Sequence, residues 1–294
     1  MVVSALGTRR LGRTGHQSTL AILGGAAFAR STPEVAEQGF HEALAAGVNH
    51  LDIAPSYGVA EAVVGPHVPA VRDRLFISEK STRANPDGVR AQMENSLRVL
   101  GCDSFDVYQA HAVTSLTELD RRGPAIEAIL RARDEGLCKY VGITGHDFGT
   151  AAAQLEAVRR YDLDTVMLPV YPGALANPQY AQDLAALLDE AARRDVGVMA
   201  IKAGAHQPWG ERTPDHDTWY EPLGDDAQIA RGVRFTLDTP GVHGLCTSGD
   251  VRILQVQIRA AATYSPMAAD EREALLREAA DWPTIFPLIE HAKG

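Results

Sequence analysis

Short apolar runs rich in β-branched and aromatic residues recur along the chain, separated by amphipathic or polar stretches. A run that is apolar at consecutive positions is typical of a strand in a parallel sheet that helices cover on both faces. The spacing between successive runs leaves room for one strand and one helix. Seven runs are predicted as strands that end near residues 52, 80, 111, 145, 170, 202 and 247.

Helices are indicated between these runs by residues suited to helix ends. A Thr or Asn before a proline can accept a hydrogen bond from the first turn, where the missing N–H of proline is not needed. Helices are therefore expected to begin at Thr32-Pro33, Asn85-Pro86 and Asn177-Pro178. Glycine favours the left-handed backbone that ends many helices, so four helices are expected to stop near Gly47, Gly101, Gly136 and Gly197.

An opening strand at 20–24 completes eight strand and helix units. Eight is the number at which a parallel sheet closes, so the predicted fold is an α/β protein of the (β/α)8 TIM barrel type. A doubly wound sheet is the competitor, but the segment from Leu23 to Phe28 lacks its G-x-G-x-x-G motif. No low-complexity linker divides the chain, and residues 1–294 are expected to form a single domain.

Two segments exceed this repeat. The stretch from Ala203 to Asp226 is expected to be a long loop inserted after the seventh strand. The stretch from Pro266 to Pro287 is expected to form a further helix and a tail that covers the mouth of the barrel or meets another subunit. Its expected docking residues are Trp282, Ile285 and Phe286.

Composition and charge exclude several classes of protein. The chain has 28 Lys and Arg against 38 Asp and Glu, a net charge of −10, and 45% hydrophobic residues. This composition is globular, and scattered basic residues in an acidic chain argue against a nucleic-acid partner. The most apolar early stretch, Leu20 to Ala29, is about half the length of a membrane-spanning helix, so no membrane association is expected.

The cysteines and the N-terminal region predict the cellular compartment. Cys102, Cys138 and Cys246 are odd in number and outside any C-x-x-C pair, which indicates buried thiols with neither a disulfide framework nor a metal site. Arg9-Arg10 precede a turn sequence instead of the apolar core of an export signal. The chain is therefore expected in the cytoplasm.

Candidate chemistry lies at the ends of consecutive strands. The carboxyl ends of barrel strands share one mouth, where barrel enzymes place their active sites. Asp52 ends the second unit and Tyr57 follows in its loop, while Lys80 and His111 end the next two strands. Each residue alone fits an ordinary structural role, such as an N-cap or a surface charge. Their coincidence on one rim favours a catalytic set.

These four residue types suit proton transfer to a carbonyl oxygen. A phenol has a pKa of about 10, and a nearby ammonium group lowers it. Tyr57 is therefore predicted as the general acid, Lys80 as the group that lowers its pKa and Asp52 as the counter-charge. His111 is predicted to hydrogen-bond the substrate oxygen. Such a reduction also needs a hydride, which implies a nicotinamide cofactor.

At this point the chain resembles the aldo-keto reductase family. The resemblance rests on five segments in order along nearly the whole chain: Arg10 to Gly15, Asp52 to Gly58, Lys80, Asp106 to His111 and Tyr140 to Gly145. It implies a (β/α)8 barrel, a catalytic set of Asp52, Tyr57, Lys80 and His111, and NADP(H) bound across the mouth without a Rossmann unit, with NAD(H) as the alternative.

The resemblance also implies a set of cofactor contacts, with departures from the family pattern. Where many members carry Ser-Asn to hold the nicotinamide carboxamide, this sequence has Thr144-Gly145, so Thr144 and His146 are expected to substitute. Leu168 or a neighbour stands where a glutamine is usual, and Ile201 where an aromatic ring often stacks, which predicts weaker stacking. The expected cofactor-binding residues are Gly25, Thr144, His146, Lys202, Thr247, Ser248, Arg252 and Gln255.

Two of these assignments have alternatives. Arg252 is predicted to pair with a 2′-phosphate, with a solvated charge on an amphipathic helix as the alternative, and Asp250 nearby disfavours phosphate. Lys202 is predicted to bind a pyrophosphate, with a salt bridge on the barrel rim as the alternative. Glu79, beside Lys80, is expected on the opposite strand face with a basic partner or a helix N-terminus.

The inserted loop is the expected substrate loop. Its large side chains, Trp209, Trp219 and Tyr220, argue against disorder and are predicted to contact the substrate, with packing on the side of the barrel as the alternative. Together with His111-Ala112-Val113, they indicate an apolar or aromatic wall.

Three functions remain open from the sequence. The leading one is NADPH-dependent reduction of an aldehyde or ketone, or the reverse oxidation, on a small-molecule substrate. The second is an imine-forming lyase or aldolase that uses Lys80 or Lys202 as the amine. The third is a nicotinamide-binding regulatory protein with little turnover.

Overall fold

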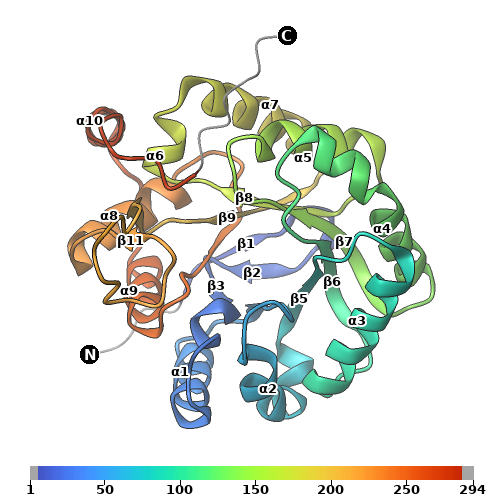
Figure 1. The fold of residues 1–294 in the computed structure, drawn as a ribbon. Helices are drawn as coiled ribbons and strands as arrows, with labels where there is room; N and C mark the ends of the chain where they lie inside the picture. Colours follow the sequence, from blue (N-terminus) through green and yellow to red (C-terminus); the bar gives the residue numbers. More distant parts are fainter. Residues whose placement is uncertain (1–5, 287–294) are drawn as a thin grey trace.

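The strands form a closed parallel barrel. The structure is a computed structural model that describes residues 6–286. Eight strands pair in the order β12-β3-β4-β5-β6-β7-β8-β9, and helices surround them as an outer ring (Figure 1). The predicted (β/α)8 barrel is thereby confirmed. The strands are β3 Ala21–Gly24, β4 His50–Asp52, β5 Phe76–Ser81, β6 Phe105–Ala110, β7 Cys138–Thr144, β8 Thr165–Pro169, β9 Gly197–Ile201 and β12 Gly244–Cys246.

The three predicted helix starts are confirmed. The side chains of Thr32, Asn85 and Asn177 each accept a hydrogen bond from a backbone N–H of the first turn, and a proline follows each of them. The helices are α1 Pro33–Ala45, α2 Ala60–Val64, α3 Pro86–Leu100, α4 Leu116–Asp134, α5 Thr150–Arg160, α6 Pro172–Leu175, α7 Pro178–Arg194, α8 Asp226–Leu237, α9 Val251–Ala262 and α10 Ala269–Ala279.

One predicted helix stop is wrong. Gly47, Gly101 and Gly136 follow their helices with positive φ, as expected. At the end of α7, however, Asp195 takes the left-handed conformation with φ 56°, and Gly197 is the first residue of β9. A Cβ at position 197 would lie 2.7 Å from the Leu11 side chain. Gly197 therefore allows a close approach across the barrel instead of ending a helix.

A hairpin covers the amino-terminal end of the barrel. Strands β1 Thr8–Arg10 and β2 Gln17–Thr19 are antiparallel and are visible across the centre of Figure 1. The turn between them, η1 Gly12–Thr14, confirms the predicted tight turn. Leu11 is fully buried here among apolar side chains of the barrel interior, including Phe76 and Met199. The amino-terminal end is thereby closed, and the carboxyl-terminal end of the barrel remains for a functional site.

The inserted loop and the C-terminal segment lie together at the mouth. The loop contains the antiparallel pair β10 Ala205–Gln207 and β11 Glu221–Pro222. Trp282 packs edge-on against His206, with ring centroids 4.8 Å apart. Phe286 is buried and contacts Trp219 of the loop, 6.2 Å between ring centroids. The predicted docking residues are therefore confirmed up to Phe286, and Pro287 lies outside the described residues.

The cysteines are unpaired, and the helices lack a membrane-spanning pattern, within residues 6–286. Cys102, Cys138 and Cys246 are free thiols. Among the helices of residues 6–286, not one combines the length and the apolar character that crossing a lipid bilayer requires.

Candidate active site

The structure brings Asp52, Tyr57, Lys80 and His111 together at the carboxyl ends of the strands. The Lys80 ammonium donates hydrogen bonds to Asp52 Oδ1 at 2.7 Å and to the Ile53 carbonyl oxygen at 2.8 Å, and both charged side chains are buried. Lys80 Nζ lies 5.2 Å from the centre of the Tyr57 ring. The His111 ring meets the Tyr57 ring edge-on at 5.9 Å between centroids. The four side chains form one cluster.

The acidity of Tyr57 differs from the sequence expectation. Burial raises the pKa of the Tyr57 phenol well above its usual value, and the nearby Asp52 carboxylate raises it further. The sequence expectation of a lowered pKa is therefore not met in the protein alone, where burial and the Asp52 carboxylate set the direction of the shift. Tyr57 is consequently a neutral phenol that holds its proton at physiological pH.

Two residues that the sequence analysis did not select support Asp52. Gln109 Nε2 donates to Asp52 Oδ1 at 3.3 Å, and the Cys246 thiol lies 3.5 Å from Asp52 Oδ2. Both lie on strands and are buried. The sequence could have indicated both residues, because each is a polar residue near the end of a predicted strand. Their contacts with Asp52 help to hold the carboxylate beneath Lys80.

His111 and His146 form an imidazole pair. Their Nε2 atoms are 3.1 Å apart, so one ring donates and the other accepts. Burial lowers the pKa of His146 to about 3, and the Lys202 and Lys80 charges add to this effect. Burial likewise lowers the pKa of His111 well below its usual value, with a further contribution from Lys80. Both rings are therefore neutral in the folded protein.

A cavity of about 470 Å³ opens beside this cluster. Asp52 and Tyr57 line its floor, and Met167 and Ile201 give it apolar walls. The volume is in the range of small-molecule sites. Of the residues predicted for cofactor and substrate, the cavity is lined by His146, Lys202, Trp219, Tyr220, Thr247 and Ser248.

Another hollow, of about 690 Å³, lies at the opposite end of the barrel. It is larger and more open, and three of its charged groups are already paired, since Asp106 contacts both Arg72 and Lys139. The paired charges and the position away from the catalytic cluster favour the smaller cavity as the ligand site.

Lys202 is held in a strained position at the cavity wall. Its backbone is left-handed, with φ 76°. Its ammonium lies 4.6 Å from the centre of a Trp219 ring and 5.0 Å from the Tyr220 ring, within cation–π range. Burial lowers the pKa of Lys202 to about 8. Ala112, next to His111, is also left-handed, so strain gathers at the mouth as it does in many functional sites.

Several predicted site residues do not reach the cavity. The Trp209 indole N–H donates to the Thr218 carbonyl oxygen at 2.7 Å and thereby closes the inserted loop on itself. Gln255 points outward and donates to Glu42 on α1 at 2.6 Å. Thr144 is buried beneath the rim. Gly25 packs on the end of β4, where a Cβ would lie 2.8 Å from the Ile53 side chain.

Arg252 also faces away from the cavity. Its guanidinium donates to both carboxylate oxygens of Asp250 and to the Asp215 carbonyl oxygen. Asp250 caps α9 by accepting from the Arg252 N–H at 2.9 Å, and Gln257 accepts from the Ser248 N–H at 2.7 Å. The Ser248 and Arg252 backbone N–H groups are thus bonded within the protein.

Three further residues line the cavity: a strand neighbour of Leu168, a residue that was not predicted, and a predicted threonine. Met167, not Leu168, lines the cavity, because adjacent strand residues face opposite sides. Arg30 lines the cavity although no motif indicated it, and its exposed guanidinium lies 3.7 Å from Asp217. Thr247 lines the cavity while its hydroxyl accepts from the Gly24 N–H at 2.9 Å.

Glu79 has no basic partner among the described residues, contrary to expectation. It is fully buried, and its Oε1 accepts only the Lys80 backbone N–H. Burial raises the pKa of Glu79 well above its usual value, and the neighbouring Glu61 carboxyl adds to the rise. The side chain is therefore kept in its neutral form.

Comparisons with known proteins agree with this geometry. The model of the aldo/keto reductase family matches residues 21–216. Over 140 residues the chain is 29% identical to an aldo/keto reductase of Synechocystis sp., a match that covers 39% of this chain and 42% of that protein. Over 109 residues it is 36% identical to an NAD/NADP-dependent indole-3-acetaldehyde reductase of Schizosaccharomyces pombe, covering 35% of this chain and 37% of that protein. These matches thus span less than half of either relative.

Solved structures share the fold at low sequence identity. An aldo-keto reductase from Bacillus halodurans, in its holo form, matches with a TM-score of 0.72 and 18% identity, over 94% of this chain and 96% of that one. An aldo-keto reductase from Klebsiella pneumoniae in complex with NADPH matches with a TM-score of 0.67 and 20% identity, over 96% of this chain and 97% of that one.

Proposed function

The chain belongs to the aldo/keto reductase family, and from this premise we propose that it is an NAD(P)H-dependent oxidoreductase that reduces an aldehyde or ketone to an alcohol, or catalyses the reverse oxidation. The observation that carries the proposal is the buried Lys80–Asp52 pair beneath a neutral phenol at the floor of a ligand-sized cavity. Reduction of a carbonyl requires a proton donor at such a floor.

Tyr57 is the proposed proton donor. Its raised pKa keeps the hydroxyl protonated until a carbonyl oxygen gains negative charge in front of it. As the phenolate forms, the Lys80 ammonium 5.2 Å from the ring centre stabilises it. Asp52 pairs with Lys80 and holds it in place, since an unpaired buried ammonium would be costly.

The neutral His111 ring is proposed to orient the substrate. In the protein alone its Nε2 atom contacts His146. A carbonyl oxygen that enters the cavity can accept a hydrogen bond from the imidazole pair in place of that contact. The Met167, Ile201 and Trp219 side chains in the cavity wall favour substrates with an apolar or aromatic group.

The residues at the mouth offer cations for the pyrophosphate of a dinucleotide but a carboxylate where its 2′-phosphate was expected. A bound nicotinamide would supply the hydride that reaches the carbonyl carbon. Lys202 and Arg30 line the cavity and are proposed to bind the pyrophosphate. Asp250 occupies the start of α9, where a 2′-phosphate was expected. NADPH is the proposed cofactor, and this carboxylate keeps NADH as the alternative.

Substitution of Tyr57 by Phe tests the proposed function. Tyr57→Phe is expected to lower kcat for aldehyde reduction about 1,000-fold, because it removes the proton donor and little volume. The dissociation constant for NADPH, measured by fluorescence quenching, should change less than about threefold, because Phe keeps the shape of the ring. A threefold change is less than about 0.7 kcal/mol of binding free energy. Tyr140→Phe, at the other end of the barrel, is the matched control. Full activity in Tyr57→Phe would reject the assignment.

A second candidate function is imine formation at Lys202. This residue lines the cavity, and its pKa of about 8 leaves a fraction of the amine unprotonated at neutral pH. Lys80 does not favour this chemistry, because its ammonium is fully buried and bonded to Asp52. Borohydride trapping of a carbonyl compound on Lys202 would support the second candidate. Nucleotide binding without turnover of reactive aldehydes would instead support the regulatory alternative.

A further inference from the structure

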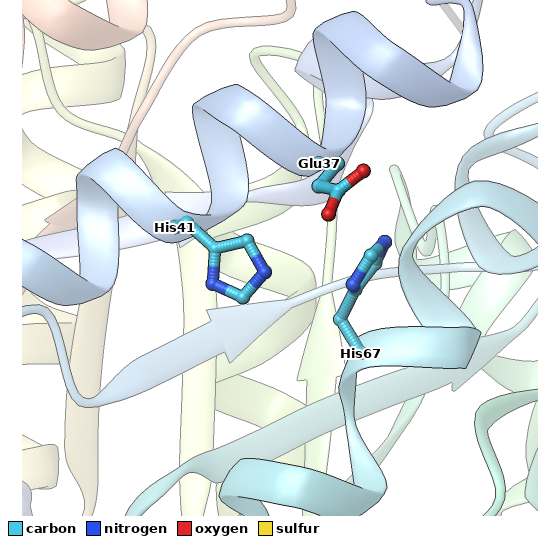
Figure 2. Close-up of side chains that lie close together, drawn as sticks. All are labelled: Glu37, His41 and His67. Atoms are coloured by element: carbon cyan, nitrogen blue, oxygen red, sulfur yellow. The ribbon is translucent and has the colours of Figure 1, made fainter.

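A group of metal-ligating side chains lies outside the barrel mouth. Glu37 and His41 are one turn apart on α1, and His67 ends the short helix η3 Gly65–His67 that follows α2. Figure 2 shows the carboxylate and the two imidazole rings turned toward one common space between the two elements. One potential ligand atom from each residue lies within 4.8 Å of the other two.

The donor set fits a first-row divalent cation. Residues at i and i+4 share one face of a helix, which places Glu37 and His41 on the same side of α1. Two imidazoles and one carboxylate are characteristic zinc ligands, with a water molecule in the fourth position. Ligands around zinc lie about 3.3 Å apart, for bonds of 2.0–2.1 Å. The present separations thus need a small closure.

The three side chains are free to make that closure. Within residues 6–286, Glu37, His41 and His67 form neither a salt bridge nor a side-chain hydrogen bond to other groups. Glu37 and His41 are exposed and His67 is half-buried. Their rotamers can therefore change without breaking polar contacts.

The backbones that carry the ligands are anchored in the core. Phe40 is fully buried beneath the cluster, and its ring centroid lies 5.7 Å from that of His41 and 6.1 Å from that of His67. Gly65 packs so closely on α3 that a Cβ would lie 2.3 Å from the Val99 carbonyl oxygen. The His41 and His67 rings are edge-to-face at 5.2 Å. The site is thus built on two fixed elements.

We propose that Glu37, His41 and His67 bind one zinc ion, which joins α1 to η3 on the outer surface of the barrel. None of the three residues lines the active-site cavity. The ion therefore has a structural role and takes no part in the reaction. It stabilises the folded protein because its three ligands are brought together only after folding.

Zinc titration of the full chain tests the proposal. Isothermal titration calorimetry with zinc chloride should give one site per chain, and saturating zinc should raise Tm by about 5 °C. EDTA should reverse the shift, and magnesium should not produce it, because Mg²⁺ prefers oxygen ligands. His41→Gln and His67→Gln should each remove at least about 90% of the zinc affinity. Glu34→Gln, on the same helix outside the cluster, is the matched control.

The double variant distinguishes zinc binding at this site from zinc binding elsewhere in the protein. Retained binding in the His41→Gln, His67→Gln double variant would overturn the proposal, since zinc would then sit elsewhere. Absence of binding in the wild-type chain would overturn it as well. Because Tm and calorimetry do not depend on carbonyl reduction, neither result bears on the reductase proposal.

Discussion

At the floor of the cavity, the neutral or charged state of each side chain follows from its immediate neighbours. Asp52 and Lys80 are both buried, and each would be costly alone, but at 2.7 Å they neutralise one another. The phenol beside them and the two imidazoles remain neutral because burial opposes their charged forms. The site therefore holds one ion pair among neutral proton carriers.

The proposed contact between Lys202 and the pyrophosphate predicts that nucleotide binding depends on pH. Its lowered pKa of about 8 means that the free protein carries this charge below pH 8 and loses it above. The dissociation constant for NADPH is therefore expected to rise about tenfold between pH 7 and pH 9. Lys202→Gln should bind more weakly at pH 7 and show no such rise, while Lys139→Gln should behave as wild type. Equal pH profiles in wild type and Lys202→Gln would contradict this role.

Glu79 makes stability depend on pH in the opposite sense to a paired carboxylate. Its pKa is raised in the folded state, so its stabilising effect is complete below the unfolded pKa of about 4.3 and is lost as pH rises. Glu79→Gln keeps the shape and removes the titration. The free energy of unfolding of Glu79→Gln relative to wild type should increase from pH 5 to pH 8, by about 1 kcal/mol or more.

Urea unfolding at both pH values measures this difference. The exposed Glu127→Gln on α4 is the control and should show a constant difference. A constant difference for Glu79→Gln as well would mean that Glu79 is ionised in the folded protein.

At the level of elements, the amino-terminal hairpin and β9 depend on each other. Gly12, in the hairpin turn, and Gly197 permit this contact, since a Cβ on Gly12 would lie 2.3 Å from the Gly197 nitrogen. Gly197→Ala would place its Cβ against Leu11, which is fully buried. We expect a loss of about 1–3 kcal/mol in unfolding free energy, as for other overpacked cores.

The matched control for this element is Gly15→Ala or Gly47→Ala, where nothing lies within 4 Å of the added Cβ. Both have positive φ, so a loss of about 1 kcal/mol from backbone strain is expected there. Chemical denaturation of the three variants distinguishes steric overlap from strain. If Gly197→Ala lowers the free energy of unfolding no more than the controls do, the hairpin can move away from the added methyl group at little cost.

Helix starts were predictable because they are local. A side chain that accepts from an N–H three residues later needs no tertiary contact, and Thr32, Asn85 and Asn177 all do so. The end of α7 was not predictable in this way, because Gly197 was needed for a contact with Leu11, far away in the chain.

At the level of the whole molecule, the strands close into one ring. The first strand, β3, pairs with the last, β12, so that both ends of the repeat are needed for closure. One main cluster of buried side chains extends from Leu6 to Phe286. We therefore expect calorimetry to show a single unfolding transition with equal calorimetric and van't Hoff enthalpies. Two resolved transitions would contradict the single-domain prediction.

The sequence by itself determined the alternation of strands and helices, their order, and the positions of Asp52, Lys80 and His111 at strand ends with Tyr57 in the loop after the second strand. These features follow from local periodicity, helix capping and the rule that parallel strands share one carboxyl-terminal rim. The eight-unit count then led to the closed barrel.

Only the tertiary structure decided which side chains line the cavity and which bind other groups of the protein instead. Arg252 pairs with Asp250, Trp209 closes its own loop and Gln255 pairs with Glu42, although all three had been assigned to the site. It also decided that Tyr57 keeps its proton. Burial and hydrogen-bonding partners depend on groups that folding brings together from distant positions in the chain. They set both the protonation state of a side chain and the direction in which it points.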